Sequence, residues 1–130
     1  MEFQTLLESR RSVRSYDASK TVTREQIKEI VEAGILAPSW KNSQTARYYC
    51  VIDEAAKEKF AKECLPEFNI NSSKGAGAYV ITTFVANRSG FDREGNPDNE
   101  CGNGWGYYDL GLHNENVILK AKELGLDTLV

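Results

Sequence analysis

Residues 10–16 read Arg10-Arg11-Ser12-Val13-Arg14-Ser15-Tyr16, which places three arginines and two serines directly after a short helical pattern. Guanidinium groups match phosphate oxygens in a bidentate manner, and serine hydroxyls donate hydrogen bonds to the same anion. The run is too short to follow a nucleic-acid groove, and its neighbours do not extend it. A solvated basic surface is the alternative interpretation. We predict a site for a compact anion, such as the phosphate of a small cofactor.

The composition excludes several classes of protein. The chain has 130 residues, which suits a single domain, and its 41% hydrophobic content supports a packed core. The net charge of −3, from 16 basic and 19 acidic side chains, disfavours nucleic acid and anionic membranes as partners. There is neither an apolar run long enough to cross a bilayer nor a hydrophobic signal segment. The three cysteines lack C-x-x-C spacing, which favours reduced thiols in the cytoplasm.

Apolar periodicity predicts the elements of the first half of the chain. A helix is expected over residues 2–10. Thr23 and Gln26 form a capping box for a second amphipathic helix, which Pro38 ends. A polar loop then leads to a predicted strand over residues 47–52. Asp53 is expected to cap a third helix, which extends through Cys64.

The second half alternates between apolar and polar stretches. Residues 69–77 are predicted as a loop, and residues 78–86 as a strand buried on both faces because the apolar run is continuous. Residues 87–106 form a long loop of the kind that often serves as a flexible lid. The longest helix is expected over residues 107–124; its apolar residues extend almost all round, which indicates a central or interface helix, and Gly125 ends it.

The last residues, Leu126-Asp127-Thr128-Leu129-Val130, have the pattern of the opening of a third buried strand. A domain seldom ends on an unfinished hydrophobic element. We therefore expect the 130 residues to be a single domain that lacks its C-terminal part.

Four features occur in a defined order. They are the run at residues 10–16, the loop Ala37-Pro38-Ser39-Trp40-Lys41-Asn42-Ser43-Gln44, the apolar strand, and Gly106-Tyr107-Tyr108-Asp109-Leu110-Gly111 at the start of the long helix. In this order and spacing they resemble the nitroreductase family of FMN-dependent oxidoreductases. The resemblance implies an α+β fold with a central, mostly antiparallel sheet flanked by helices. It also implies an intertwined homodimer with two FMN molecules at the subunit interface.

The resemblance further implies an activity. NAD(P)H would donate hydride to FMN, which would pass it to nitroaromatics, quinones or similar acceptors in a ping-pong cycle. The protein would bind and orient the flavin, which carries the chemistry itself, so no catalytic side chain is expected. The alternative is a non-catalytic dimeric flavin- or nucleotide-binding module of the same fold. The bulky Trp40-Lys41 pair and the expected missing segment favour that alternative.

Site residues follow from the same resemblance. Arg10, Ser12 and Arg14 would hold the FMN phosphate, ribityl chain and pyrimidine edge, with Arg11 contributing chiefly through its backbone, and Arg14 would stabilise the reduced ring. Pro38, Ser39, Asn42 and Gln44 would approach the isoalloxazine from the partner subunit. Lys74 and either Asn69 or Asn71 would add a further contact, on a looser local match.

Other candidate sites are weaker. His113 is the only histidine and has no Ser or Cys partner for a triad, so a structural or an exposed histidine is expected. One histidine and scattered cysteines give no metal-ligand spacing. Gly102, Gly104 and Gly106 follow a polar loop instead of a strand, which does not match a dinucleotide fingerprint. Tyr107 and Tyr108 either line the substrate side of the flavin or pack at the start of the helix.

Overall fold

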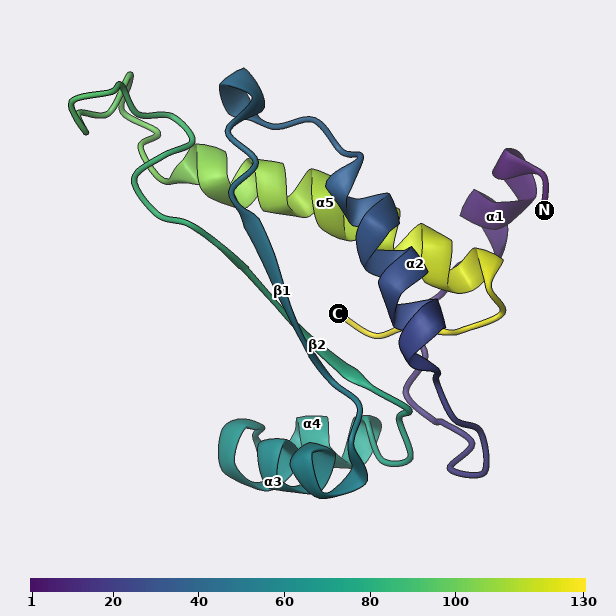
Figure 1. The fold of residues 1–130 in the computed structure, drawn as a ribbon. Helices are drawn as coiled ribbons and strands as arrows, with labels where there is room; N and C mark the ends of the chain where they lie inside the picture. The colour runs from purple at the N-terminus through teal and green to yellow at the C-terminus, as the bar shows by residue number, and fades with distance from the viewer.

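The computed structural model describes residues 1–130 and combines helices with one pair of antiparallel strands (Figure 1). This confirms the predicted α+β class. The elements in chain order are α1 (Phe3–Ser9), α2 (Arg24–Ile35), the 3₁₀ turn η1 (Trp40–Asn42), β1 (Ala46–Val51), α3 (Glu54–Cys64), α4 (Glu67–Ser72), β2 (Tyr79–Phe84) and α5 (Gly104–Glu123).

Local sequence signals fix the starts of α2 and α3. The Thr23 hydroxyl oxygen accepts the Gln26 N–H at 3.1 Å, and the Gln26 side chain accepts the Thr23 N–H at 2.9 Å, so the predicted capping box is present. The Asp53 carboxylate accepts the Ala56 N–H at 3.0 Å at the start of α3. Helix α2 ends at Ile35, three residues before Pro38.

Strands β1 and β2 pair in antiparallel register, from Ala46 opposite Phe84 to Val51 opposite Tyr79. The prediction that the second strand is buried on both faces is wrong, because every residue of β2 is only half-buried. Strand β2 pairs with β1 alone, and α5 is the helix that packs against it. The continuous apolar run therefore reflects β propensity more than two-sided burial.

Helix α5 runs along the molecule and crosses α2, as Figure 1 shows, and this confirms its predicted central place. It begins at Gly104, three residues before the predicted start. A Cβ at Gly34 of α2 would lie 2.8 Å from the Val117 side chain, so the two helices meet at close range where this glycine lies. Ile30, Val117 and Ala121 form the buried cluster between them.

Two further segments differ from the sequence-based expectation, and a third agrees with it. Helix α4 (Glu67–Ser72) overlaps the loop predicted over residues 69–77, because Pro66 ends the preceding turn and its carbonyl accepts the N–H groups of Asn69 and Ile70. Residues 126–130 form only an isolated parallel bridge, between Thr128 and Ser12, instead of a strand. Residues 87–103 are a series of turns tied together by side-chain hydrogen bonds, such as that from Asn103 to Asn87 at 2.8 Å.

Candidate functional site

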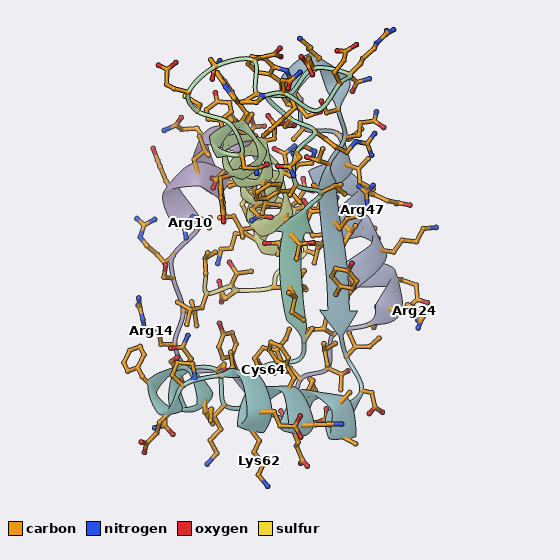
Figure 2. The ribbon with its side chains drawn as sticks, turned by 90° about the vertical axis from the view of Figure 1, so that its left-hand side faces the viewer. Arg10, Arg14, Arg24, Arg47, Lys62 and Cys64 are labelled. Carbon is orange, nitrogen blue, oxygen red and sulfur yellow. The ribbon has the colours of Figure 1, made fainter.

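The arginine segment is an extended strip of chain that leaves the end of α1. Arg10 closes the helix through its N–H to the Leu6 carbonyl at 3.1 Å, and its backbone is already extended. Farther along, the Val13 N–H donates to the Thr128 carbonyl at 3.0 Å, which ties the strip to the other end of the chain. Figure 2 shows Arg10 beside α1 and Arg14 farther down, toward α4.

The donors of this strip are almost free of intramolecular partners. Arg10, Arg11 and Arg14 take part in no salt bridge, and the one hydrogen bond among them runs from Arg11 Nη1 to the Arg10 carbonyl at 2.7 Å. Ser12 is exposed. A set of uncommitted guanidinium and hydroxyl donors on one strip is the chemistry that a phosphate monoester requires, so these residues fit an FMN phosphate.

The turn that carries Lys74 lies against the far end of the strip. A Cβ on Gly75, whose φ is +82°, would lie 2.9 Å from the Tyr16 carbonyl oxygen. Lys74 and Asn71 are both exposed, Asn71 on α4. The structure thus brings the turn of Lys74 to the strip of Arg14.

Tyr16 anchors the strip at this point. Its hydroxyl donates to the Val13 carbonyl at 2.9 Å. Burial raises the pKa of the Tyr16 phenol, and the nearby Asp127 carboxylate raises it further. The neutral phenol is therefore the form that the folded protein favours.

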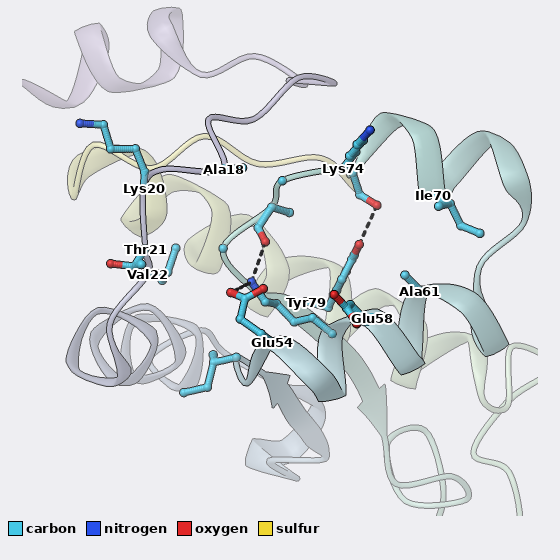
Figure 3. A pocket seen from close by; sticks show the side chains of 16 residues that line it. Ala18, Lys20, Thr21, Val22, Glu54, Glu58, Ala61, Ile70, Lys74 and Tyr79 are labelled. Atoms are coloured by element: carbon cyan, nitrogen blue, oxygen red, sulfur yellow. Dashed lines mark hydrogen bonds and ion pairs between the residues drawn. The ribbon is translucent and has the colours of Figure 1, made fainter.

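A cavity of about 420 Å³ lies beside this turn, lined by α3, residues 18–22 and residues 73–77 (Figure 3). Lys57 is buried at its wall, and its ammonium group lies 2.7 Å from a Glu54 carboxylate oxygen and donates to the Ala76 carbonyl at 3.1 Å. Because both interactions are internal, Lys57 joins α3 to the 73–77 turn and leaves little binding capacity for a ligand. We assign it a structural role.

The turn from Pro38 to Gln44 has an unusual backbone. Lys41, Asn42 and Gln44 have φ values of +46°, +54° and +51°, in the left-handed region. The turn holds itself partly through its serines, because Ser39 Oγ accepts the Gln44 N–H at 3.0 Å and the Ser43 hydroxyl donates to the Trp40 carbonyl. The predicted contact residues Pro38, Asn42 and Gln44 are exposed, and Ser39 is half-buried.

Asp109 of α5 binds the backbone of this turn through its carboxyl group, a role that the sequence analysis missed. Only 3% of its surface is exposed, and its two carboxyl oxygens lie 3.1 and 3.0 Å from the Trp40 backbone nitrogen, whose N–H they accept. The buried Ser89 hydroxyl donates to the same carboxyl group. The only feature of the sequence that could have indicated this role is that Asp109 is an acidic residue among the apolar residues of the long helix. The ring of His113 is buried, with Nδ1 2.7 Å from the Asp109 carbonyl oxygen, which confirms its structural role.

An aromatic cluster completes the surroundings of the turn. The Trp40 and Trp105 rings lie 4.4 Å apart, centroid to centroid, and Tyr108 meets Trp105 edge-on at 6.0 Å. The Lys41 ammonium lies 5.5 Å from the Trp40 ring centroid and 2.9 Å from an Asp98 oxygen. These rings line a cavity of about 240 Å³ beside the turn. Tyr107 is exposed and its ring packs against Phe84. Whether Tyr107 and Tyr108 line the substrate side of the flavin or only pack at the start of α5 therefore stays a prediction.

Within one chain the two predicted contact regions lie apart. The turn η1 is the short coil at the top of Figure 1, at the end of β1 that is far from α3 and α4, whereas Figure 2 places Arg14 beside the α3–α4 layer. No group of three or more His, Cys, Asp or Glu side chains gathers as a metal site. None of the helices combines the length and apolar character that crossing a bilayer requires.

Comparisons with known proteins identify the family of this chain. The sequence profile of the nitroreductase family matches residues 7–130. "Putative NAD(P)H nitroreductase YdgI" of Bacillus subtilis is 35% identical over 84 residues, which are 65% of this chain and 39% of that protein. "Putative NAD(P)H nitroreductase MhqN" of the same organism is 33% identical over 72 residues, or 55% of this chain and 35% of that protein. The chain thus matches well under half the length of these two relatives.

Solved structures share the fold. A nitroreductase family protein from Clostridium novyi superposes with a TM-score of 0.74 at 18% identity, covering 96% of this chain and 66% of that one. A structure described as "a putative nitroreductase in complex with fmn" from Desulfovibrio desulfuricans has a TM-score of 0.69 at 26% identity, with 93% and 62% coverage. The predicted nitroreductase-like fold is confirmed, and the chain belongs to the nitroreductase family.

Proposed function

We propose that the protein is an FMN-dependent oxidoreductase that transfers hydride from NAD(P)H to nitroaromatics, quinones or similar acceptors by a ping-pong mechanism. The observation that carries the proposal is the strip of unpaired arginine donors from Arg10 to Arg14 in a chain of the nitroreductase family. A related solved structure holds FMN, and two relatives are named for NAD(P)H. FMN, when bound, supplies the hydride-accepting ring.

The residues of this chain would divide the work of holding the flavin. Arg10, Arg11 and Ser12 would bind the phosphate and ribityl chain. Arg14 would lie at the pyrimidine edge, where a cation favours the reduced ring, and Lys74 with Asn71 would add polar contacts from the adjoining turn. Their placement on one strip and its neighbouring turn supports this division.

The remaining contacts would come from a second copy of the chain. Pro38, Ser39, Asn42 and Gln44 lie at the opposite end of the strand pair from Arg14, so one chain alone does not present both sets to one flavin. This supports a homodimer with flavin sites between subunits. Three free cysteines agree with a cytoplasmic location for it.

The visible spectrum of the purified protein tests the proposal. We expect flavin absorption bands that bleach when NAD(P)H is added without oxygen, and steady oxidation of NAD(P)H once a quinone is supplied. A colourless protein that takes up no FMN in a titration would contradict the proposal. Bound FMN without turnover would instead favour a non-catalytic flavin-binding module.

A further inference from the structure

The Pro38–Gln44 turn has a conformation that its own sequence does not favour. Lys41, Asn42 and Gln44 are all left-handed; asparagine adopts this backbone readily, but for Lys41 and Gln44 it costs about 1–2 kcal/mol per residue. Strained turns of this kind persist only where the surrounding structure determines them strongly. An interaction from outside the turn must therefore help to hold it.

Asp109 supplies that interaction across the fold. Both of its carboxyl oxygens lie within 3.1 Å of the Trp40 nitrogen, and the Ser89 hydroxyl fixes the carboxyl group from the other side. The Trp40 N–H belongs to the peptide group that also carries the Ser39 carbonyl. Holding this N–H therefore fixes the orientation of the peptide plane at the residue that is expected to face the flavin.

Stability alone does not account for an aspartate at this position. Asp109 is buried and makes no salt bridge, and burying a carboxyl group costs free energy that its hydrogen bonds only offset. An apolar side chain would avoid that cost, but it would leave the Trp40 N–H and the buried Ser89 hydroxyl without their acceptor. What the carboxyl adds is a hydrogen bond to one specific backbone group.

We propose that Asp109 is a positioning residue that acts through the Trp40 N–H and sets the place of the Pro38–Gln44 turn against the flavin. The proposal rests on the proposed function for its flavin-directed part. Ser89 orients the carboxyl group, and the Trp40–Trp105 pair reports the position of the turn, because its ring centroids lie only 4.4 Å apart.

The test compares four variants of the protein. Asp109→Ala removes all the hydrogen bonds, Asp109→Asn keeps one acceptor oxygen for the Trp40 N–H, and Ser89→Ala removes the orienting hydroxyl. Asp92→Ala is the matched control, since Asp92 is an exposed aspartate of the 87–103 segment that bonds only within its own turn, to the N–H of Asn96 at 2.8 Å.

Two readouts are followed, and the first needs no flavin. Near-ultraviolet circular dichroism of the flavin-free protein measures the coupling of the tryptophan pair, and we expect Asp109→Ala to lose it and Asp109→Asn to keep most of it. FMN titration is expected to show about tenfold weaker binding for Asp109→Ala, a smaller change for Ser89→Ala and none for Asp92→Ala. For a quinone acceptor, KM should rise more than kcat falls.

Unchanged tryptophan coupling and FMN affinity in a folded Asp109→Ala protein would overturn the proposal. If that variant does not fold by far-ultraviolet circular dichroism, wild-type FMN affinity of Ser89→Ala overturns it instead. If the wild-type protein binds no FMN, the proposed function fails together with the flavin-directed part. The tryptophan signal of Asp109→Ala then still decides whether Asp109 holds the turn.

Discussion

The Arg10–Arg14 strip and the Pro38–Gln44 turn are expected to contact the same kind of cofactor, but the structure holds them in opposite ways. The strip is extended and exposed, and the Val13 N–H to Thr128 is its backbone tie to the rest of the fold. The turn is strained, and a buried carboxyl, a serine pair and two indole rings in contact hold it.

This difference separates two ways of building a binding site. The strip has free donors and little fixed shape, so binding an anion there orders side chains and costs conformational entropy. The turn has a fixed shape, and the entropy of its ordering is lost when the protein folds. We therefore expect changes in the turn to affect folding stability and changes in the strip to affect ligand affinity.

The largest expected effect is a loss of folding stability when the packing around Trp105, beside the turn, is disturbed. Gly90→Ala would place a Cβ 2.5 Å from Trp105 Cδ1 and 2.7 Å from the Gly102 carbonyl oxygen, at a φ of +82°. We expect the free energy of unfolding to fall by about 3 kcal/mol or more in a urea titration. Gly95→Ala is the control, because its φ is +87° but no atom lies within 4 Å of the added Cβ. It should cost about 1 kcal/mol; equal losses would refute close packing at Gly90.

The second effect concerns the strip. Arg14→Ala should weaken FMN binding by about 2 kcal/mol, since a charge-assisted hydrogen bond is lost, and should lower the reduction potential of the flavin that remains. The stability of the flavin-free protein should change by less than about 0.5 kcal/mol. Arg24→Ala, at an exposed arginine of α2, is the control and should leave FMN affinity unchanged (Figure 2). A large loss of stability with Arg14→Ala would remove the distinction between the two regions.

A smaller effect measures the strain of the turn. Lys41→Gly and Lys41→Ala both remove the salt bridge to Asp98, but only glycine adopts a φ of +46° without cost. The glycine variant should be about 1 kcal/mol more stable than the alanine variant. At Lys62, inside α3, the order should reverse by a similar amount because glycine is unfavourable in helices. If the alanine variant were more stable than the glycine variant at Lys41 as well, the turn would not be strained.

The smallest effect is a pH dependence at the end of the strip. Because burial, followed by Asp127, raises the pKa of Tyr16 above its usual value near 10, the folded state favours the neutral phenol. The corresponding stability is present below pH 10 and is lost as the pH rises through the folded pKa. Tyr16→Phe should therefore lose less stability than wild type between pH 9 and pH 11 in urea titrations. Parallel curves for the two proteins would contradict this assignment.

The sequence predicted best those features that depend on neighbouring residues. The capping box at Thr23 and Gln26, the cap at Asp53 and the glycine after α5 each depend on residues within one helical turn. Helix α4 was missed because its short sequence, Glu-Phe-Asn-Ile-Asn-Ser, has no clear apolar period, and Pro66 reads as a breaker as much as a start.

The residues of the candidate site likewise separate into those that neighbouring residues predict and those that depend on contacts between distant segments. The arginine strip could be proposed from the sequence, because its arginines and serines are neighbours in the chain and occur together with the Pro38–Gln44 motif. The role of Asp109 was not evident, because its partners Trp40 and Ser89 come from two other segments and meet it only in the folded chain. The left-handed turn could not be foreseen either, since Lys41 and Gln44 do not favour that backbone.

The hydrogen bond from Val13 to Thr128 has a consequence for the order of folding. During synthesis the arginine strip leaves the ribosome among the first residues, but its backbone partner follows only after α5 has been made. Closing so long a loop is slow compared with forming the helices, whose contacts are local. The arginine strip should therefore be among the last parts of this chain to order, and hydrogen exchange during refolding should protect the amide of Val13 later than those of α2.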